Sequence, residues 1–135
     1  MSNAAIGFFD SGLGGLTVRQ EVIQLLPNEN TIYLADSAHA PYGEKTQAGI
    51  LERSRLNTEW LLGQGCKLIV IACNTATTNA IAVLRREYAI PFVGIEPAIK
   101  PAALNSESKS VGVLATRGTL SSALLRVLPE CIPPV

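Results

Sequence analysis

Cys73 is the residue of this 135-residue sequence whose setting most directly suggests chemistry. It follows an apolar run at residues 67–72 and precedes Asn74 and Thr75, so it lies where a buried strand turns into a helix. Amide dipoles at a helix N-terminus favour a thiolate, and we expect them to lower the thiol pKa from about 8.5. A buried structural cysteine is the alternative, but two polar residues directly after the thiol are hard to explain by packing.

Asp10 ends another apolar run, residues 4–9, and places a carboxylate at a neighbouring strand end. Two other kinds of enzyme active site that are built on a cysteine do not fit this sequence. A phosphatase loop requires an arginine at position 79, which is Asn79, and a protease-like pair requires a histidine base, for which only His39 is available. Cys73 and Asp10 therefore remain as a candidate acid/base pair for proton transfer.

The glycine-rich segment at residues 10–15 also invites a nucleotide-binding interpretation. A dinucleotide fingerprint starting at Gly12 would need glycine at position 17, which is Thr17, and the Gly-Lys-Ser/Thr of a phosphate loop is absent from the sequence. Asp36, after the next apolar run, does imitate the ribose-binding acid of such folds. A dinucleotide-binding module stays as a minor alternative, beside a plain tight turn.

Strands and helices alternate along the chain. Apolar runs predict strands at 4–9, 31–35, 67–72, 92–95 and 111–115, and helical periodicity is found at 16–26, 46–62, 76–88 and from Leu120. This order predicts an α/β fold with a doubly wound, mostly parallel sheet in three layers. Ligands of such sheets bind at the carboxyl ends of the strands, where Asp10, Asp36, Cys73 and Thr116 are expected.

Composition narrows the possible partners. Apolar residues make up 47% of the chain, and 11 basic residues balance 11 acidic ones, so neither nucleic acid nor a membrane surface is expected as a partner. No apolar run approaches the roughly 18 residues of a spanning helix, and we expect a cytoplasmic protein. Three cysteines without a CxxC pair, and one histidine, support neither a disulfide framework nor a metal site.

Four side-chain groups have simpler interpretations. Cys66, in the turn before residues 67–72, is expected to be structural, and Cys131 has no motif around it. The charged residues 52–59 are interpreted as a solvated helix face, and Trp60 and Tyr88 as core or interface residues.

Four short segments in order carry a family resemblance. Residues 9–15 (FDSGLGG), 40–43 (APYG), 72–77 (ACNTAT) and 112–116 (GVLAT) resemble the successive motifs of bacterial glutamate racemases, members of the aspartate/glutamate racemase family. Each motif alone is weak, but four in this order are a strong signal, and the match runs from about Ile6 to Ser122.

The resemblance implies two similar α/β domains that bind glutamate between them and interconvert its L and D forms without a cofactor or metal, supplying D-glutamate for peptidoglycan. It implies that Cys73 is one of two catalytic thiols and that Asp10 assists it. The residues that the resemblance assigns to substrate binding are Asp10, Ser11, Tyr42, Gly43, Asn74 and Thr75, with Thr116 a less certain member.

The sequence departs from the family in one respect. Inversion needs a base on one face of the α-carbon and an acid on the other, and the family's second thiol lies in a Gly-Cys-Thr-His segment that this sequence lacks. We therefore expect an N-terminal racemase-like domain at 1–127, a proline-rich tail at 128–135 and no second domain. The alternatives are a non-catalytic fragment that binds glutamate or self-associates, with a homodimer possible, and a related aspartate racemase.

Overall fold

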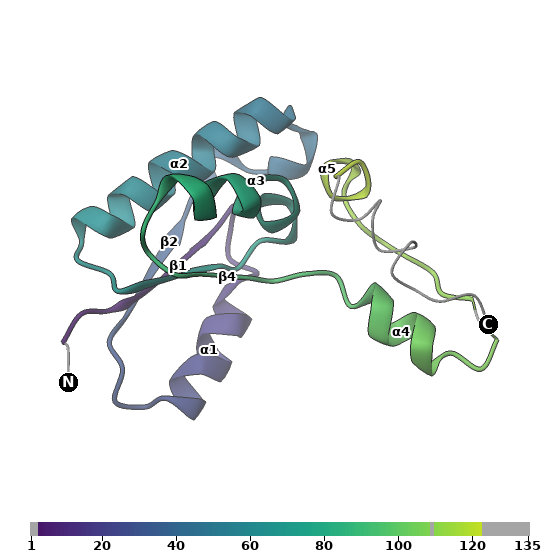
Figure 1. The fold of residues 1–135 in the computed structure, drawn as a ribbon, viewed down its shortest axis with the longest axis horizontal. Coiled ribbons are helices and arrows are strands. Elements are labelled where there is room, and N and C mark those ends of the chain that lie inside the picture. The colour runs from purple at the N-terminus through teal and green to yellow at the C-terminus, as the bar shows by residue number, and fades with distance from the viewer. Residues whose placement is uncertain (1–2, 109, 123–135) are drawn as a thin grey trace.

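A four-stranded parallel sheet forms the centre of the computed structural model, which describes residues 3–108 and 110–122 (Figure 1). The strands are β1 (Ile6–Asp10), β2 (Thr31–Ala35), β3 (Leu68–Ile71) and β4 (Phe92–Gly94), in the order β2-β1-β3-β4. Every residue of β1 is buried, because β1 is a central strand with both faces covered. In the register, Ile6 lies opposite Thr31 on one side and Leu68 on the other.

Three main helices cover the sheet, with α1 (Leu16–Leu25) on one face and α2 (Gln47–Gly63) and α3 (Asn74–Glu87) on the other (Figure 1). The sequence encodes the starts of two of them. The Thr46 hydroxyl accepts a hydrogen bond from the Gly49 amide, and the Cys73 sulfur accepts one from Ala76. The predicted three-layer, doubly wound fold is confirmed.

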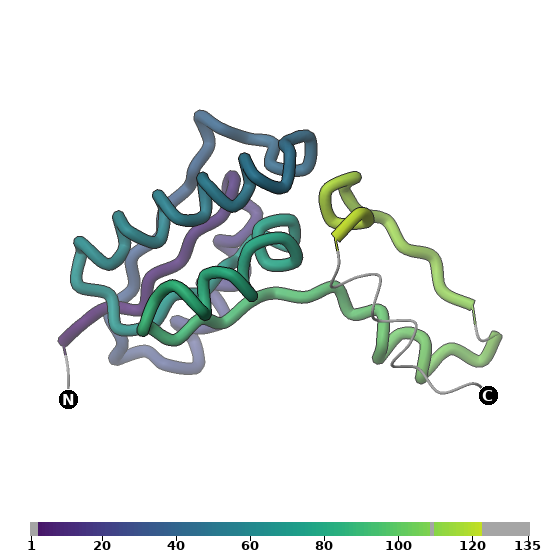
Figure 2. The backbone as a smooth tube through the Cα atoms, turned by 45° about the horizontal axis from the view of Figure 1, so that its top comes forward, coloured from purple at the N-terminus to yellow at the C-terminus, as the bar shows by residue number. Residues whose placement is uncertain are grey.

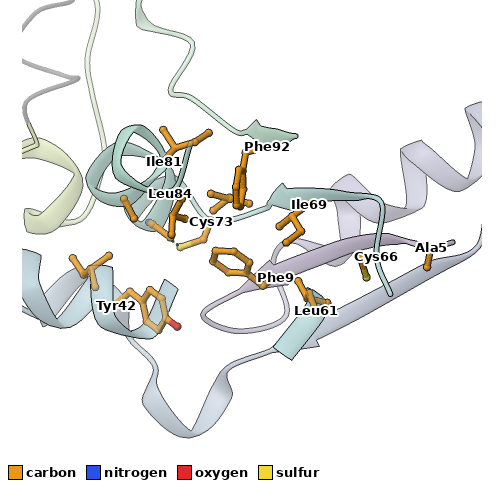
Figure 3. Packing of buried hydrophobic residues seen from close by; sticks show 14 residues of the cluster. Ala5, Phe9, Tyr42, Leu61, Cys66, Ile69, Cys73, Ile81, Leu84 and Phe92 are labelled. Carbon is orange, nitrogen blue, oxygen red and sulfur yellow. Dashed lines mark hydrogen bonds between the residues drawn. The ribbon is translucent and has the colours of Figure 1, made fainter. Parts of the chain in front are cut away.

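Alternation along the strands divides the core into two layers. Phe9, Ile69 and Ile71 point toward α2 and α3, where they pack in a cluster that includes Leu61 and Leu84 (Figure 3). On the opposite face Ile6, Phe8 and Val70 pack with Val18 and Val22 of α1. The sheet is therefore buried from both sides.

The predicted fifth strand is wrong. After β4 the chain leads away from the sheet into α4 (Ile99–Asn105) and returns through residues 111–115, which are extended but pair with no strand among the described residues (Figure 2). Leu114 is wholly exposed. The run has the apolar composition of a strand, but composition does not specify a neighbour, and Pro97 follows β4 where the chain turns away.

The returning segment ends in α5 (Arg117–Leu120), which contacts α3 and the short η2 (Tyr42–Glu44). The predicted helical start at Leu120 is wrong, because the Thr116 side chain caps α5 by accepting from the Thr119 amide at 3.2 Å. Cys131 and the predicted boundary at residue 127 lie outside the described residues.

Three simpler interpretations can be checked against burial. Cys66 is buried, as expected, with its sulfur close to Gly7, and Tyr88 packs against the core and the ring of Phe92. Trp60 is about half exposed, so it is not a core residue. The charged face of α2 is not simply solvated, because Arg53 forms a part-buried ion pair. Within the described ranges, no helix is long and apolar enough to cross a membrane.

Candidate active site

A cavity of about 550 Å³ lies where β1 and β3 end. This is the point of the sheet at which the chain order reverses, since β1 lies between β2 and β3, and ligands of α/β sheets bind there. Its wall is formed by the end of β1, the glycine-rich segment, the start of α3 and the returning segment. The polar side chains of this wall are Asp10, Thr17, Asn74, Thr75, Thr116 and Thr119.

Asp10 is buried at the end of β1, and its carboxylate is held by neutral donors. One oxygen accepts from the Ser11 amide at 2.7 Å, and the other accepts from the Gly15 amide at 2.9 Å and the Tyr33 hydroxyl at 3.4 Å. A Cβ on Gly15 would lie 2.6 Å from that of Ala72. The glycine at position 15 therefore lets the loop close around the carboxylate.

Tyr33 is a residue of this site that the sequence analysis missed. Its hydroxyl donates to the Gly12 carbonyl at 3.0 Å as well as to Asp10. Burial, with the nearby Asp10 carboxylate adding to it, raises the pKa of Tyr33 to about 12. The phenol is thus a neutral donor, and its position in the middle of a strand gave no sign of this contact.

Cys73 is buried beside the cavity, and its sulfur is 3.8 Å from the Ser11 hydroxyl, to which the thiol can donate. Burial raises the pKa of this thiol and the Asp10 carboxylate raises it further, and together they outweigh the lowering effect of the Ala76 amide and of Ser11. The predicted lowering by the helix start is present, but the net effect is a raised thiol pKa. A thiol that is mostly protonated at neutral pH needs a group that can take its proton.

Ser11 connects the two members of the predicted acid/base pair. Its hydroxyl lies 3.4 Å from an Asp10 oxygen and 3.8 Å from the Cys73 sulfur. Within the described part of the chain, no direct hydrogen bond joins Asp10 to Cys73. The structure therefore brings these three residues together, with the hydroxyl between the thiol and the carboxylate.

Three threonine hydroxyls meet at the opposite wall. Thr75 Oγ1 lies 2.9 Å from Thr116 Oγ1 and 3.1 Å from Thr119 Oγ1. The Asn79 amide donates to the carbonyls of Thr75 at 2.8 Å and Gly118 at 3.0 Å, which ties α5 to α3. Thr119 was missed from sequence, although its spacing of three from Thr116 is typical of residues that share a helical face.

Tyr42 and Gly43 lie beside this cavity and do not line it. The Tyr42 ring is part of the buried cluster (Figure 3), and its hydroxyl donates to Asp36 and accepts from Asn57. Gly43 packs against Thr116 so closely that a Cβ would lie 2.5 Å from the Thr116 Cβ. Gly43 also lines a neighbouring cavity of about 650 Å³. The substrate-binding roles assigned to both residues stay predictions.

Asp36, the residue that resembles a ribose-binding acid, is buried, and both of its carboxylate oxygens accept hydrogen bonds from side chains of this protein. Its carboxylate accepts from Arg53, Tyr42 and His39. Burial raises its pKa, but the hydrogen bonds from these three residues together lower it to about 2. Asp36 therefore has no oxygen left for a ribose. Among the described residues, no group of three His, Cys, Asp or Glu side chains could hold a metal ion.

Comparison with known proteins gives a consistent picture. The family model for Asp/Glu/hydantoin racemases matches residues 15–130. The chain is 58% identical over 119 residues to the glutamate racemase of Cupriavidus pinatubonensis, covering 88% of this chain and 44% of that protein. It is also 58% identical over 128 residues to the glutamate racemase of Ectopseudomonas mendocina, covering 94% of this chain and 49% of that protein.

Solved structures agree. Escherichia coli glutamate racemase, in complex with L-glutamate and the activator UDP-MurNAc-Ala, superposes with a TM-score of 0.85 at 40% identity, over 96% of this chain and 49% of that one. The glutamate racemase of Aquifex pyrophilus superposes with a TM-score of 0.84 at 38% identity, over 93% of this chain and 51% of that one. The chain thus spans about half the length of the relatives that it matches.

Proposed function

Since the chain belongs to the Asp/Glu/hydantoin racemase family, we propose that it supplies one catalytic face of a glutamate racemase, with Cys73 as the acid/base thiol. The observation that carries the proposal is the thiol at the cavity, linked through the Ser11 hydroxyl to the Asp10 carboxylate. Glutamate is favoured as the substrate over aspartate because the curated relatives at 58% identity are glutamate racemases.

The proposed first step is proton transfer within the cavity. The Cys73 thiol passes its proton through Ser11 toward Asp10, and the thiolate then removes the α-proton of glutamate. The electron pair of the broken C–H bond stays on the substrate and spreads into its α-carboxylate. The backbone amides at the start of α3 and the threonine hydroxyls of the cavity wall would stabilise that developing charge. The proposal assigns Asn74 and Thr75 to this role, and it is supported by their position in the cavity lining.

The second step returns a proton to the carbanion. When Cys73 returns it, the substrate regains its original configuration and only exchange with solvent is seen. Inversion requires an acid on the opposite face, and among the described residues Cys73 is the only thiol that lines the cavity. The proposal includes the remaining expectations from the resemblance: no cofactor, a cytoplasmic location and D-glutamate supply for peptidoglycan.

Proton NMR of L-glutamate in D2O with the purified chain tests the proposal. We expect loss of the α-proton signal, with L configuration retained by chiral analysis. The rate should increase with pH through and above the ordinary thiol range, because burial raises the pKa of Cys73 and the thiolate is the base. No exchange at any pH would contradict the proposal, and D-glutamate would show that a second face is also served.

A non-catalytic, self-associating role is the second candidate. It is favoured by the exposed apolar side chains of the returning segment, Val111, Val113 and Leu114. Analytical ultracentrifugation distinguishes the two: a dimer that dissociates on Leu114→Ser while glutamate exchange stays absent would support this alternative.

A further inference from the structure

The loop at residues 37–46 connects β2 to α2, and only two of its residues, Tyr42 and Gly43, are buried. Gly43 packs against Thr116, and the η2 turn of this loop contacts α5. The position of this loop therefore sets the position of one wall beside the cavity. A loop with so few buried residues needs an anchor to hold it there.

The anchor begins at Asp36, the residue directly before the loop. Its two oxygens accept from Arg53 Nη2 and Nε, each at 2.9 Å, and one of them also accepts from the Tyr42 hydroxyl. Asn57 donates to the same Tyr42 hydroxyl at 2.9 Å. Arg53 and Asn57 are four residues apart on α2 and so lie on one face of the helix. A continuous polar network thus runs from α2 to the tip of the loop.

Arg53 is the cation that pairs with Asp36 in this network, and the geometry of the pair is specific. Asp36 is buried, and a buried carboxylate needs a cationic partner to offset its lost hydration. Two of the three guanidinium nitrogens, Nε and Nη2, donate to the carboxylate, which fixes the plane of Asp36 and with it the direction of the oxygen that Tyr42 contacts. His39 also contacts Asp36, at 2.8 Å, but it belongs to the exposed part of the loop itself.

We propose that Arg53 is a positioning residue, whose two-point ion pair with Asp36 orients the Tyr42 hydroxyl and so holds the tip of the 37–46 loop against Thr116. Arg53 does not line the cavity, so its effect on chemistry is indirect. The part of the proposal that concerns glutamate rests on the proposed function. The part that concerns the loop does not.

Selective proteolysis of the full chain tests this directly. Lys45 lies in the loop and Lys67 at the start of the sheet body, so an endoproteinase that cleaves after lysine reports on both. Arg53→Gln should accelerate cleavage after Lys45 about tenfold and leave cleavage after Lys67 within about twofold, because only the loop is released. The matched control is Arg55→Gln, on the same helix, which removes an exposed pair with Glu87.

Each outcome decides the proposal. Unchanged cleavage after Lys45 in Arg53→Gln would overturn it, and so would equal acceleration at Lys45 and Lys67, which would mean that Arg53 stabilises the whole body. Glutamate titration by NMR is run on the same samples, and affinity should fall about tenfold in Arg53→Gln and not in Arg55→Gln. Selective cleavage with no glutamate binding by the unaltered chain would support the anchor and refute the proposed function.

Discussion

Asp10 and Asp36 occupy matching places in the fold and have different surroundings. Both are buried at the carboxyl ends of adjacent parallel strands, and the Asp36 amide donates to the Asp10 carbonyl at 2.9 Å. Asp10 is held by amides and a phenol and lines the cavity. Asp36 is paired with Arg53 and does not line it. The sheet therefore brings both carboxylates to one edge, and their partners decide which can act on a ligand.

The difference has an electrostatic consequence. Hydrogen bonds from neutral donors stabilise a carboxylate without cancelling its charge, whereas a guanidinium cancels it. Within the described ranges, no cation pairs with Asp10, so its negative charge remains available at the cavity. That charge raises the pKa of the neighbouring Cys73 thiol, and it suits the ammonium group of an amino acid.

The largest effect is expected at the thiol itself. Cys73→Ser should lower glutamate α-proton exchange by about a thousandfold or more, because an alkoxide is far harder to form than a thiolate. Exchange is measured by NMR in D2O. Cys66→Ala is the control, since Cys66 is also buried but lies at the other end of β3; equal loss in both variants would mean that the fold, and not the Cys73 thiol, is affected.

The next effect separates the two carboxylates. Asp10→Asn should reduce the exchange rate at saturating glutamate by about a hundredfold, because an amide cannot accept the relayed proton. Asp36→Asn should leave that rate within about threefold and weaken glutamate binding, because it loosens the loop. Measuring the exchange rate over a series of glutamate concentrations gives both the rate at saturation and the glutamate concentration at half-saturation. The reverse pattern would show that the assignment of roles is wrong.

Acid should weaken the Asp36 network. The folded-state pKa of about 2 lies below the ordinary value of 3.8, so the ionised carboxylate stabilises the fold above about pH 4 and this contribution is lost as the pH falls toward 2. The contribution is on the order of 2 kcal/mol. Urea unfolding at about pH 5 and about pH 2.5 should show a larger loss in the unaltered chain than in Asp36→Asn. If both proteins lose the same free energy of unfolding, then titratable groups other than Asp36 dominate the loss of stability in acid.

The sequence predicted the sheet body well for a physical reason. The apolar runs ending at Asp10 and Cys73 are long enough to be buried on both faces, and their polar ends fall at the edge where ligands bind. Residues 111–115 have the same composition, but an apolar run does not say which strand will pair with it. The fifth strand was therefore predicted where the structure has none.

The failures at the site have a similar origin. Arg53 was interpreted as part of a solvated face because its partner, Asp36, is 17 residues away across a loop. The pKa of Cys73 was predicted to be lowered from its place at a helix start, but burial has the larger effect. Pairing across a loop and depth of burial are properties of the folded chain, and local sequence patterns do not contain them.

The smallest effect concerns Gly43, which belongs to the loop that joins the Asp36 network to the cavity wall. Gly43→Ala places a Cβ 2.5 Å from the Thr116 Cβ, so α5 must shift. Because α5 is short and has few neighbours, we expect a local cost of about 1 kcal/mol. Hydrogen exchange should become faster at the Leu120 and Ser121 amides, which bond within α5, and stay unchanged in β1.

Gly12→Ala is the matched control for that substitution, because nothing lies within 4 Å of the added Cβ. It should leave the exchange of the α5 amides unaltered. If Gly43→Ala also leaves them unaltered, then α5 does not rest on the loop, and an anchor at Asp36 has no route to Thr116. If the α5 amides exchange faster while β1 stays protected, then the loop that follows Asp36 supports α5 through the contact between Gly43 and Thr116.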